Sequence, residues 1–450
     1  MDCTTIFSPN TGRTYGRWRP DSPKTVAEHL AVLDQSRREL EGDVQRRVAV
    51  LDALIDAMET VRSELAQLTV DEVGKKPAEA ADEIDYAISF LSYCRKLARE
   101  YRFTTAVDGR TIREVAPGVA LLITPFNDPL AGITRKIGPA IAAGASVLVK
   151  PAPLGMLCAQ AMNAAFQSTS AASFVRFACL EDPSVTETLI MDPRVGVVSF
   201  TGSTRVGSIV AVAAAQNHKR AVLELGSNAP FVILADADLD RALDDLMARK
   251  LRAAGQACSS VNRVYVDRRV YLTFREMLIE RVKRLTLGPS TTAVDLGPLR
   301  TAAAMQQLEC WSVEAVSMGE RLVAGSAKGA AEGEPFLFPM SVIEADSASL
   351  FDRIETFGPI LSLRAFDQVD ALLAVLEAER HALVAYFYTG CPEVLEPKLK
   401  NLRFGSIGLN TTAIQGADMP TGGFGEAGVG REGGPWGLRE FLATINQRGG

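Results

Sequence analysis

The chain contains no run of apolar residues long enough to cross a bilayer, which takes roughly 18 or more. Its first residues, Met1-Asp2-Cys3-Thr4, have neither the basic segment nor the apolar segment of a secretory signal. We therefore expect no membrane partner and a cytoplasmic location.

Histidine is scarce, with three residues in the chain, and none stands at metal-ligand spacing from another histidine or from a cysteine. The seven cysteines are widely spaced and include no Cys-x-x-Cys pair, which disfavours both a disulfide framework and a zinc site. We expect free thiols, no metal, and no mechanism that needs a histidine beside a serine or cysteine.

Positive charge is not concentrated anywhere, and the net charge of -6 argues against a nucleic-acid partner. The composition, with 47% hydrophobic and 23% charged residues, is that of an ordinary globular protein. A chain of 450 residues exceeds the size at which one core stops growing, so two or three structural units are expected.

Hydrophobic periodicity divides the chain into parts. Spacings of three and four residues predict a helical layer from about 25 to 102, and Asp108-Gly109 between two β-rich runs predicts a hairpin over 103–115. From residue 119 onward apolar strands alternate with helices. The strands expected first are 119–123, 146–150, 174–180, 195–200 and 221–225. Fully apolar strands linked by helices indicate a parallel sheet covered on both faces, so we predict a doubly wound α/β domain followed by a second α/β unit.

A glycine turn, 201–207, follows the strand expected at 195–200 and precedes a helical segment. Such a turn at the carboxyl end of a strand can hold a phosphate on the free N–H groups of the next helix. The spacing of Gly202 and Gly207 nearly matches a P-loop, but Ser208 stands where that motif needs lysine. A G-x-G-x-x-G pattern is also absent, so the turn alone gives dinucleotide binding only modest support.

Cys258 is the candidate nucleophile, because it follows Gly255-Gln256-Ala257 in a run of small residues that a substrate can reach. A cysteine taken alone is more often a small buried hydrophobe. A working thiol needs a base, a donor that stabilises an oxyanion, and an acceptor for the hydride or leaving group.

Two earlier residues are candidates for the base and the donor. Asn127 follows a predicted strand, where ligands bind in α/β sheets, although Asn before Asp-Pro is also common turn chemistry. Glu224 is flanked by leucines, where burial would raise its pKa toward that of a general base, although a carboxylate on a strand can also face solvent.

Six motifs, in this order along nearly the whole chain, resemble those of the aldehyde dehydrogenase superfamily. They are Thr124-Pro125-Phe126-Asn127, Leu148-Val149-Lys150-Pro151, Phe200-Thr201-Gly202-Ser203, Leu223-Glu224-Leu225-Gly226, Gly255-Gln256-Ala257-Cys258 and Glu355-Thr356-Phe357-Gly358-Pro359. The glycine-rich segment containing Gly422-Gly423 and Gly428-Val429-Gly430-Arg431-Glu432 also matches the family.

The resemblance implies oxidation of an aldehyde to its carboxylate with NAD or NADP. Cys258 would attack the aldehyde, and the Asn127 amide and the Cys258 backbone N–H would hold the oxyanion. Glu224 would activate the water that hydrolyses the thioester. The positions near the site, Asp128, Ala257, Ser259 and Ser260, are small or polar and favour a small polar aldehyde.

The resemblance also implies a set of cofactor contacts. Lys150 would contact the adenosine ribose, Gly202 and Ser203 the pyrophosphate turn, and Glu355 the nicotinamide ribose. Thr201 and Phe357 would line the nicotinamide.

The family architecture implies three parts and a homodimer or homotetramer. They are an NAD(P)-binding domain over 1–102 and 124–225, a catalytic domain over 226–430, and a β-hairpin oligomerisation arm over 103–123 and 431–450.

This sequence departs from the family pattern at several positions. Pro153 stands where a glutamate is frequent, the segment 180–183 replaces a glycine-rich turn, and Gly425 replaces a common lysine. Two alternatives remain: a CoA-acylating aldehyde dehydrogenase, against which Glu224 argues, and a non-catalytic structural relative, against which Cys258, Glu224 and Asn127 argue together.

Overall fold

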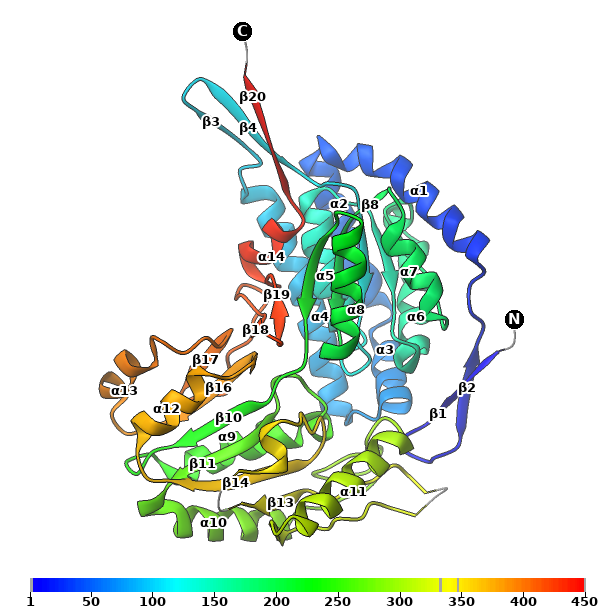
Figure 1. Ribbon diagram of the computed structural model, residues 1–450. Helices are drawn as coiled ribbons and strands as arrows, with labels where there is room; N and C mark the ends of the chain where they lie inside the picture. The colour runs from blue at the N-terminus through cyan, green and yellow to red at the C-terminus, as the bar shows by residue number, and fades with distance from the viewer. Residues whose placement is uncertain (1–2, 332–333, 346–347, 449–450) are drawn as a thin grey trace.

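The structure is a computed structural model that describes residues 3–331, 334–345 and 348–448. Two α/β bodies and a projecting arm make up the molecule, with the glycine-rich C-terminal segment running between them (Figure 1). The helices are α1 (Pro23–Glu41), α2 (Val44–Thr60), α3 (Arg62–Leu68), α4 (Pro77–Glu100), α5 (Ala131–Ala143), α6 (Met156–Gln167), α7 (Pro183–Met191), α8 (Thr204–Gln216), α9 (Leu239–Leu251), α10 (Arg268–Lys283), α11 (Ala302–Ser317), α12 (Val369–Glu377), α13 (Pro392–Leu399) and α14 (Gly434–Glu440). Five single-turn elements are η1 (Thr69–Val73), η2 (Pro153–Gly155), η3 (Ser170–Ser173), η4 (Arg252–Gly255) and η5 (Leu350–Asp352).

The first body contains a six-stranded sheet in the order β19-β9-β8-β5-β6-β7. Its strands are β5 (Val119–Ile123), β6 (Val147–Lys150), β7 (Val175–Phe177), β8 (Val195–Thr201), β9 (Arg220–Glu224) and β19 (Gly428–Val429). In this sheet β5, β6, β7, β8 and β9 are parallel to one another, and β19 is antiparallel to its neighbour β9. The chain order reverses between β5 and β8, and ligands bind in α/β sheets at the carboxyl ends of strands beside such a switch point.

Helices cover both faces of this sheet, and the helical layer predicted for 25–102 is present as α1 to α4. One core packs α2, α4, α5 and α6 against the sheet, while a second core packs α1, α7 and α8 on its other face. The doubly wound parallel sheet predicted from the apolar strands is therefore confirmed. The strand predicted over 174–180 is shorter than expected, because after Phe177 the backbone N–H of Cys179 bonds the Asp21 side chain at 2.7 Å.

The second body contains a seven-stranded sheet in the order β12-β13-β14-β11-β10-β16-β17. Its strands are β10 (Ala229–Ile233), β11 (Val261–Asp267), β12 (Arg321–Ala324), β13 (Ser341–Glu344), β14 (Ile360–Phe366), β16 (Val384–Tyr388) and β17 (Ser406–Leu409). All pairings are parallel except that of β12 with β13. The predicted second α/β unit is confirmed.

The arm is a three-stranded antiparallel sheet that projects from the first body (Figure 1). Its strands are β3 (Thr104–Val107), β4 (Arg110–Val115) and the C-terminal β20 (Ala443–Arg448). The hairpin predicted around Asp108-Gly109 is confirmed by the β3–β4 pairing, and both turn residues have positive φ, as such a turn requires.

Two predicted segment limits are wrong. The arm range 103–123 includes β5, which lies in the middle of the first sheet between β8 and β6, because its fully apolar residues are buried on both faces. The range 226–430 includes β19, which pairs with β9 of the first sheet.

The glycine-rich segment predicted as an ordered loop is ordered, and it contains β18 (Phe424–Gly425), which pairs with β15 (His381–Ala382). An N-terminal hairpin of β1 (Thr4–Phe7) and β2 (Thr14–Trp18) completes the fold. Within the described residues no helix is long and apolar enough to cross a membrane.

Candidate active site

Cys258 lies in a tight connection between η4 and β11. Ala253, Ala254 and Gly255 have positive φ angles of 49°, 54° and 76°, a conformation that is unfavourable for alanine. A Cβ at Gly255 would collide with the carbonyl oxygen of Gly358, so glycine is required there. The thiol that follows this turn remains partly exposed.

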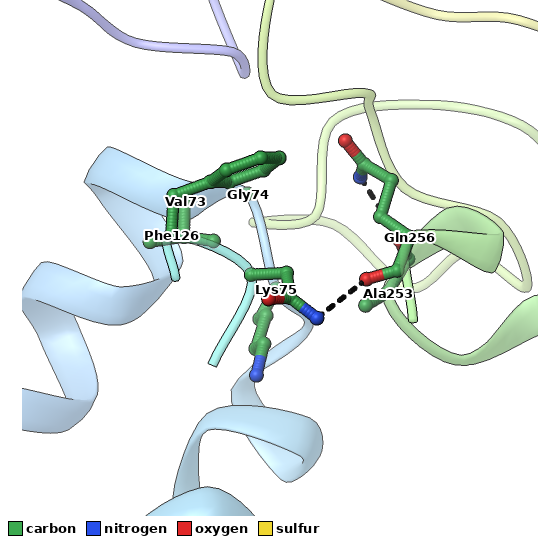
Figure 2. Close-up of a pocket in the computed structure, with 7 residues that line it drawn as sticks. Val73, Gly74, Lys75, Phe126, Ala253 and Gln256 are labelled. Atoms are coloured by element: carbon green, nitrogen blue, oxygen red, sulfur yellow. Dashed lines mark hydrogen bonds between the residues drawn. The ribbon is translucent and has the colours of Figure 1, made fainter. Parts of the chain in front are cut away.

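Asn127 follows β5 and points toward the connection that carries the thiol. Its Nδ2 donates a hydrogen bond to the Gln256 carbonyl at 3.0 Å, and the residue is 9% exposed. Gln256 is itself fixed, since its Nε2 donates to Ala253 at 2.9 Å and its Oε1 accepts from the Arg300 backbone at 2.9 Å. Ala253 and Gln256 face Lys75 and Phe126 across a small cavity that Asn127 also lines (Figure 2).

Glu224 is the last residue of β9 and is 2% exposed. The pKa of its carboxyl is raised to about 7: burial is the largest cause, the charge of Glu432 adds to the rise, and Arg135 opposes it. Its Oε1 is buried and has no hydrogen-bond partner. The predicted rise in the Glu224 pKa is confirmed, and the alternative of a solvent-facing carboxylate is wrong.

The thiol of Cys258 interacts with this carboxyl. Burial raises the pKa of the Cys258 thiol above its usual range, and the nearby Glu224 charge raises it further. The same contact between the two side chains lowers the pKa of Glu224. The thiol is therefore protonated at neutral pH until a base removes its proton, and Glu224 is the carboxylate in position to do so.

A buried ionic cluster lies behind Glu224, and the sequence did not identify it. Lys136 of α5 is 1% exposed and bonds both Glu432 and the Ser199 hydroxyl, the latter at 2.8 Å. Arg135 reaches Glu432 at 3.7 Å. Burial alone would raise the pKa of Glu432, but Lys136 and Arg135 outweigh it and lower that pKa, so Glu432 is an anion that raises the pKa of Glu224.

The β9–β19 pairing connects this cluster to Glu224. Gly428 is the register partner of Glu224, and the chain continues from β19 to Glu432 within four residues. Thr201 is the register partner of Glu224 on the other side. The only earlier signal for Glu432 was its place in a glycine-rich segment, because its contact with Lys136 spans 296 positions of sequence.

Four of the residues expected to contact the cofactor lie along one edge of the first sheet. Lys150 ends β6, Thr201 ends β8, and Gly202 and Ser203 follow β8, all at the carboxyl edge beside the switch point. Ser203 caps the 13-residue helix α8, and its Oγ accepts a hydrogen bond from the Val206 backbone. The Lys150 ammonium makes no hydrogen bond to a described residue, and burial lowers its pKa. A glycine turn, a helix N-terminus and an unused cation along one edge fit a dinucleotide phosphate and ribose.

Glu355 and Phe357 reach the same region from the second body. The Glu355 carboxyl packs on Gly226, where a Cβ would lie 2.5 Å from its Oε2. Burial raises the pKa of Glu355 to about 7, and the charge of Lys250 opposes this rise. Phe357 has a positive φ of 43°, and its ring centroid lies 6.0 Å from that of Phe126. Among the described residues no group of three or more His, Cys, Asp or Glu side chains is placed to hold a metal ion.

A cysteine beside a buried carboxyl, near an edge of the sheet that fits a dinucleotide, is an arrangement suited to an oxidoreductase with a reactive thiol. Comparison with known proteins gives the family. Residues 2–446 match the sequence model of the aldehyde dehydrogenase family.

Characterised and solved relatives agree with that match. The chain is 34% identical over 433 residues to the NADP-dependent succinate-semialdehyde dehydrogenase GabD of Escherichia coli, covering 93% of this chain and 89% of that protein. It is 35% identical over 406 residues to glutarate-semialdehyde dehydrogenase of Pseudomonas aeruginosa, covering 88% and 84%. The structure of succinate-semialdehyde dehydrogenase from Burkholderia pseudomallei superposes with a TM-score of 0.93 at 30% identity, covering 99% and 94%.

The chain therefore belongs to the aldehyde dehydrogenase family. It is an NAD(P)-dependent oxidoreductase that converts a small polar aldehyde to the corresponding acid.

Proposed function

We propose that Cys258, Glu224 and Asn127 carry out a hydrolytic oxidation in which the aldehyde passes through a thioester on Cys258. The observation that supports this most strongly is the buried Glu224 carboxyl, whose pKa is raised to about 7 and which contacts the Cys258 thiol. A base with a pKa near the working pH accepts a proton efficiently and returns it readily.

Thiol activation comes first. Glu224 removes the Cys258 proton, and the thiolate attacks the aldehyde carbon to give a hemithioacetal. The developing oxyanion is held by the Asn127 Nδ2 and the Cys258 backbone N–H. Asn127 already bonds the Gln256 carbonyl, so the amide is oriented before substrate arrives.

The cofactor-binding residues act along the edge described above. A bound nicotinamide cofactor supplies the acceptor for the hydride that leaves the hemithioacetal. Lys150 would donate to the adenosine ribose, the turn at Gly202 and Ser203 would place the pyrophosphate at the N-terminus of α8, and Glu355 would accept from the nicotinamide ribose. Thr201 and Phe357 line the nicotinamide side.

Hydrolysis follows acylation. Glu224 first releases to solvent the proton that it took from Cys258. It then takes a proton from a water molecule that attacks the thioester; the C–S bond breaks, Cys258 leaves as the thiolate, and the acid is released. A CoA-acylating enzyme does not need this carboxylate, so the presence of Glu224 at the thiol favours water as the acceptor. The intact Cys258, Glu224 and Asn127 set likewise favours an enzyme over a non-catalytic relative.

The substrate proposed is a short aldehyde with a carboxylate at its far end. Relatives that cover most of the chain are named as succinate-semialdehyde and glutarate-semialdehyde dehydrogenases. The polar residues Asp128, Ser259 and Ser260 near Cys258 fit a polar rather than a long apolar chain.

The protein is proposed to be a homodimer or homotetramer in the cytoplasm. Most residues of the three arm strands are exposed, and a small sheet needs a packed face for stability. A second copy that covers the arm supplies such a face. All seven cysteines are free, which fits a reducing compartment.

The test of this proposal is Cys258→Ala assayed with a panel of aldehydes and both nucleotides. Turnover should be abolished while nucleotide binding stays near that of the parent protein, because the thiol is not part of the phosphate-binding edge. Cys310→Ala, at an exposed cysteine of α11, serves as the control. Substantial turnover in Cys258→Ala would refute the assignment.

A further inference from the structure

Arg300 lies just before α11, and its side chain binds main-chain carbonyls from two other parts of the molecule. Its Nε donates to the Leu154 carbonyl at 2.7 Å, and its Nη1 donates to the Phe7 carbonyl at 3.2 Å. Leu154 belongs to η2, which follows β6 of the first body, and Phe7 ends β1 of the N-terminal hairpin. The side chain therefore holds the start of α11 against both of these segments.

The Arg300 guanidinium is buried, which restricts it to this one position. The residue is 3% exposed, burial lowers the pKa of its guanidinium, and the charge of Glu72 opposes that shift. A buried charge is tolerated only where hydrogen-bond partners are in place, and here they are the two carbonyls. Arg300 is thus an anchor with little freedom to move.

The main chain of Arg300 binds the residue that orients Asn127. The Arg300 backbone N–H donates to the Gln256 Oε1 at 2.9 Å. The Gln256 carbonyl accepts a hydrogen bond from the Asn127 Nδ2 at 3.0 Å. Direct hydrogen bonds therefore connect the anchored backbone of Arg300, through Gln256, to the amide assigned to the oxyanion.

Packing alone does not fix that amide. The cavity lined by Asn127, Gln256 and Gly74 has about the volume of one water molecule (Figure 2). Side chains that border such a space lack van der Waals partners on that side. Gly74 itself packs against Pro9 and Pro298, each two residues away from Phe7 or Arg300. The hydrogen bonds that begin at Arg300 therefore decide where the amide lies.

We propose that Arg300 is a positioning residue for the oxidation, which holds Gln256 and thereby keeps the Asn127 amide where the oxyanion develops. This inference rests on the proposed function and adds to it the residue that supports the oxyanion donor. Arg300 acts on Asn127 only through Gln256. An oxyanion donor works within a narrow range of distances, and a displacement of about 1 Å can cost a factor of about 100 in rate.

The experiment is a double-mutant cycle on the single-turnover rate of nucleotide reduction, with NADP and succinic semialdehyde. Asn127→Ala removes the donor and should slow reduction by about 10²- to 10³-fold. Arg300→Met keeps much of the side-chain length but loses both carbonyl bonds, and should slow reduction by roughly 10- to 100-fold. The double variant should be no slower than Asn127→Ala alone, because both changes act through one amide.

A matched control separates positioning from a general loss of stability. Arg47 is also buried and donates to three main-chain carbonyls. One of these belongs to Ala142, at the opposite end of α5 from Asn127. Arg47→Met should lower the thermal unfolding midpoint, as Arg300→Met should, but change the reduction rate by less than about threefold.

Alkylation of Cys258 by iodoacetamide supplies a readout that does not depend on turnover. This reaction creates no oxyanion, so its rate in Arg300→Met should stay within about threefold of the parent rate. Arg300→Lys keeps the buried charge and provides a folded variant if the methionine variant does not fold. It should slow reduction by a smaller factor, and should again have no effect when combined with Asn127→Ala.

Three results would overturn the proposal. They are a parent-like reduction rate in Arg300→Met, a double variant slowed by the product of the two single effects, and equal losses of reduction and alkylation. The last would show that Arg300 only stabilises the fold. Unchanged reduction in Asn127→Ala would refute the oxyanion role in the proposed function itself, and this inference with it.

Discussion

At the scale of single residues, the chemistry depends on two neighbouring groups whose pKa values are both raised. Burial disfavours the thiolate of Cys258 and the carboxylate of Glu224 alike, and the Glu224 charge further raises the pKa of the thiol, whereas the contact with Cys258 lowers the pKa of Glu224. Lys136 and Arg135 supply the positive charge that limits this effect. One proton is therefore shared between the Cys258 thiol, a weak acid, and the Glu224 carboxyl, whose pKa is about 7.

This arrangement predicts the pH dependence of hydrolysis. The raised pKa of Glu224, about 7, means that the carboxylate needed as base is lost as the pH falls through neutrality. The rate of thioester hydrolysis should therefore rise with pH through about 7 and level off above it.

The measurement is the single-turnover hydrolysis rate of the acylated enzyme between pH 5.5 and pH 9, a range of roughly two units on either side of the expected midpoint. Glu355 titrates in the same range, so Glu355→Gln is the control: it should alter nucleotide affinity and leave the hydrolysis profile in place. A profile unchanged in Glu224→Gln would show that another group is the base.

A second prediction at this scale concerns Pro153. The family glutamate frequent at this position accepts hydrogen bonds from the adenosine ribose and repels a 2′-phosphate, and proline does neither. Pro153 is half-buried at the start of η2, three residues after the free ammonium of Lys150. NADP and NAD should therefore be used within about tenfold of each other in kcat/KM, or ~1.4 kcal/mol.

Steady-state kinetics with each nucleotide at saturating aldehyde measure this ratio, and Pro153→Glu should shift it toward NAD. A parent protein that prefers NAD by more than roughly a hundredfold, ~2.7 kcal/mol, would mean that another group excludes the 2′-phosphate.

At the scale of elements, the site is assembled where loops from the two bodies meet. A fully buried lysine, Lys250, links two segments of the chain near the site. Lys250 is 0% exposed, and its Nζ donates to the Asn262 Oδ1 at 3.1 Å. The same oxygen accepts a hydrogen bond from the Thr356 hydroxyl at 2.9 Å, next to Glu355. Burial lowers the pKa of Lys250 to about 7, and the Glu355 charge opposes this shift.

Lys250→Met should therefore weaken nucleotide binding roughly tenfold, in line with ~1.5 kcal/mol for a lost charge-assisted hydrogen bond. Without the ammonium, Glu355 is more readily protonated and the 355–357 loop loses its anchor. Fluorescence titration with the reduced nucleotide measures the affinity, and alkylation of Cys258 should remain near the parent rate. Lys283→Met, at an exposed lysine of α10, is the control. Unchanged nucleotide affinity in Lys250→Met would contradict this role.

The elements themselves were largely predictable, because their signals are local. The apolar strands β5, β6 and β8 and the Asp108-Gly109 turn each carry their pattern within a few residues. The raised pKa of Glu224 followed from its leucine neighbours. The partner of Lys136 was not predictable, because this contact depends on how distant segments pack: Lys136 and Glu432 are 296 positions apart.

At the scale of the whole molecule, the exposed arm is the feature that one chain alone does not explain. Val107 on β3 and Ile445 on β20 are 52% and 39% exposed, on a sheet that projects away from the first body (Figure 1). The hairpin and the C-terminal tail were expected to form this arm together, whereas the inclusion of β5 in it was an error of boundary. Sequence shows where strands begin but not which sheet they join.

The arm predicts a change of assembly on substitution. If the proposed assembly forms, Val107→Asp with Ile445→Asp should shift it to a monomer at micromolar concentration, because charges would be placed where the proposed second copy covers apolar surface. Light scattering after size exclusion measures the mass. Val375→Asp, at a more exposed apolar position on α12, is the control, with 63% exposure. A parent protein that is already monomeric would contradict the proposed assembly.

The central claim is that one carboxylate, Glu224, hydrolyses a thioester formed on Cys258, and rapid mixing of Glu224→Gln with aldehyde and nucleotide tests it most directly. The amide keeps the shape of the side chain and cannot accept a proton, so hydrolysis should slow by about 10²- to 10⁴-fold. Because Glu224 also deprotonates Cys258, acylation should be slowed too, but by less than hydrolysis. The account therefore predicts a burst of reduced nucleotide equal to the enzyme concentration, followed by slower turnover. A variant in which the burst itself disappears would show that Glu224 acts mainly in deprotonating Cys258, and would contradict the hydrolytic role.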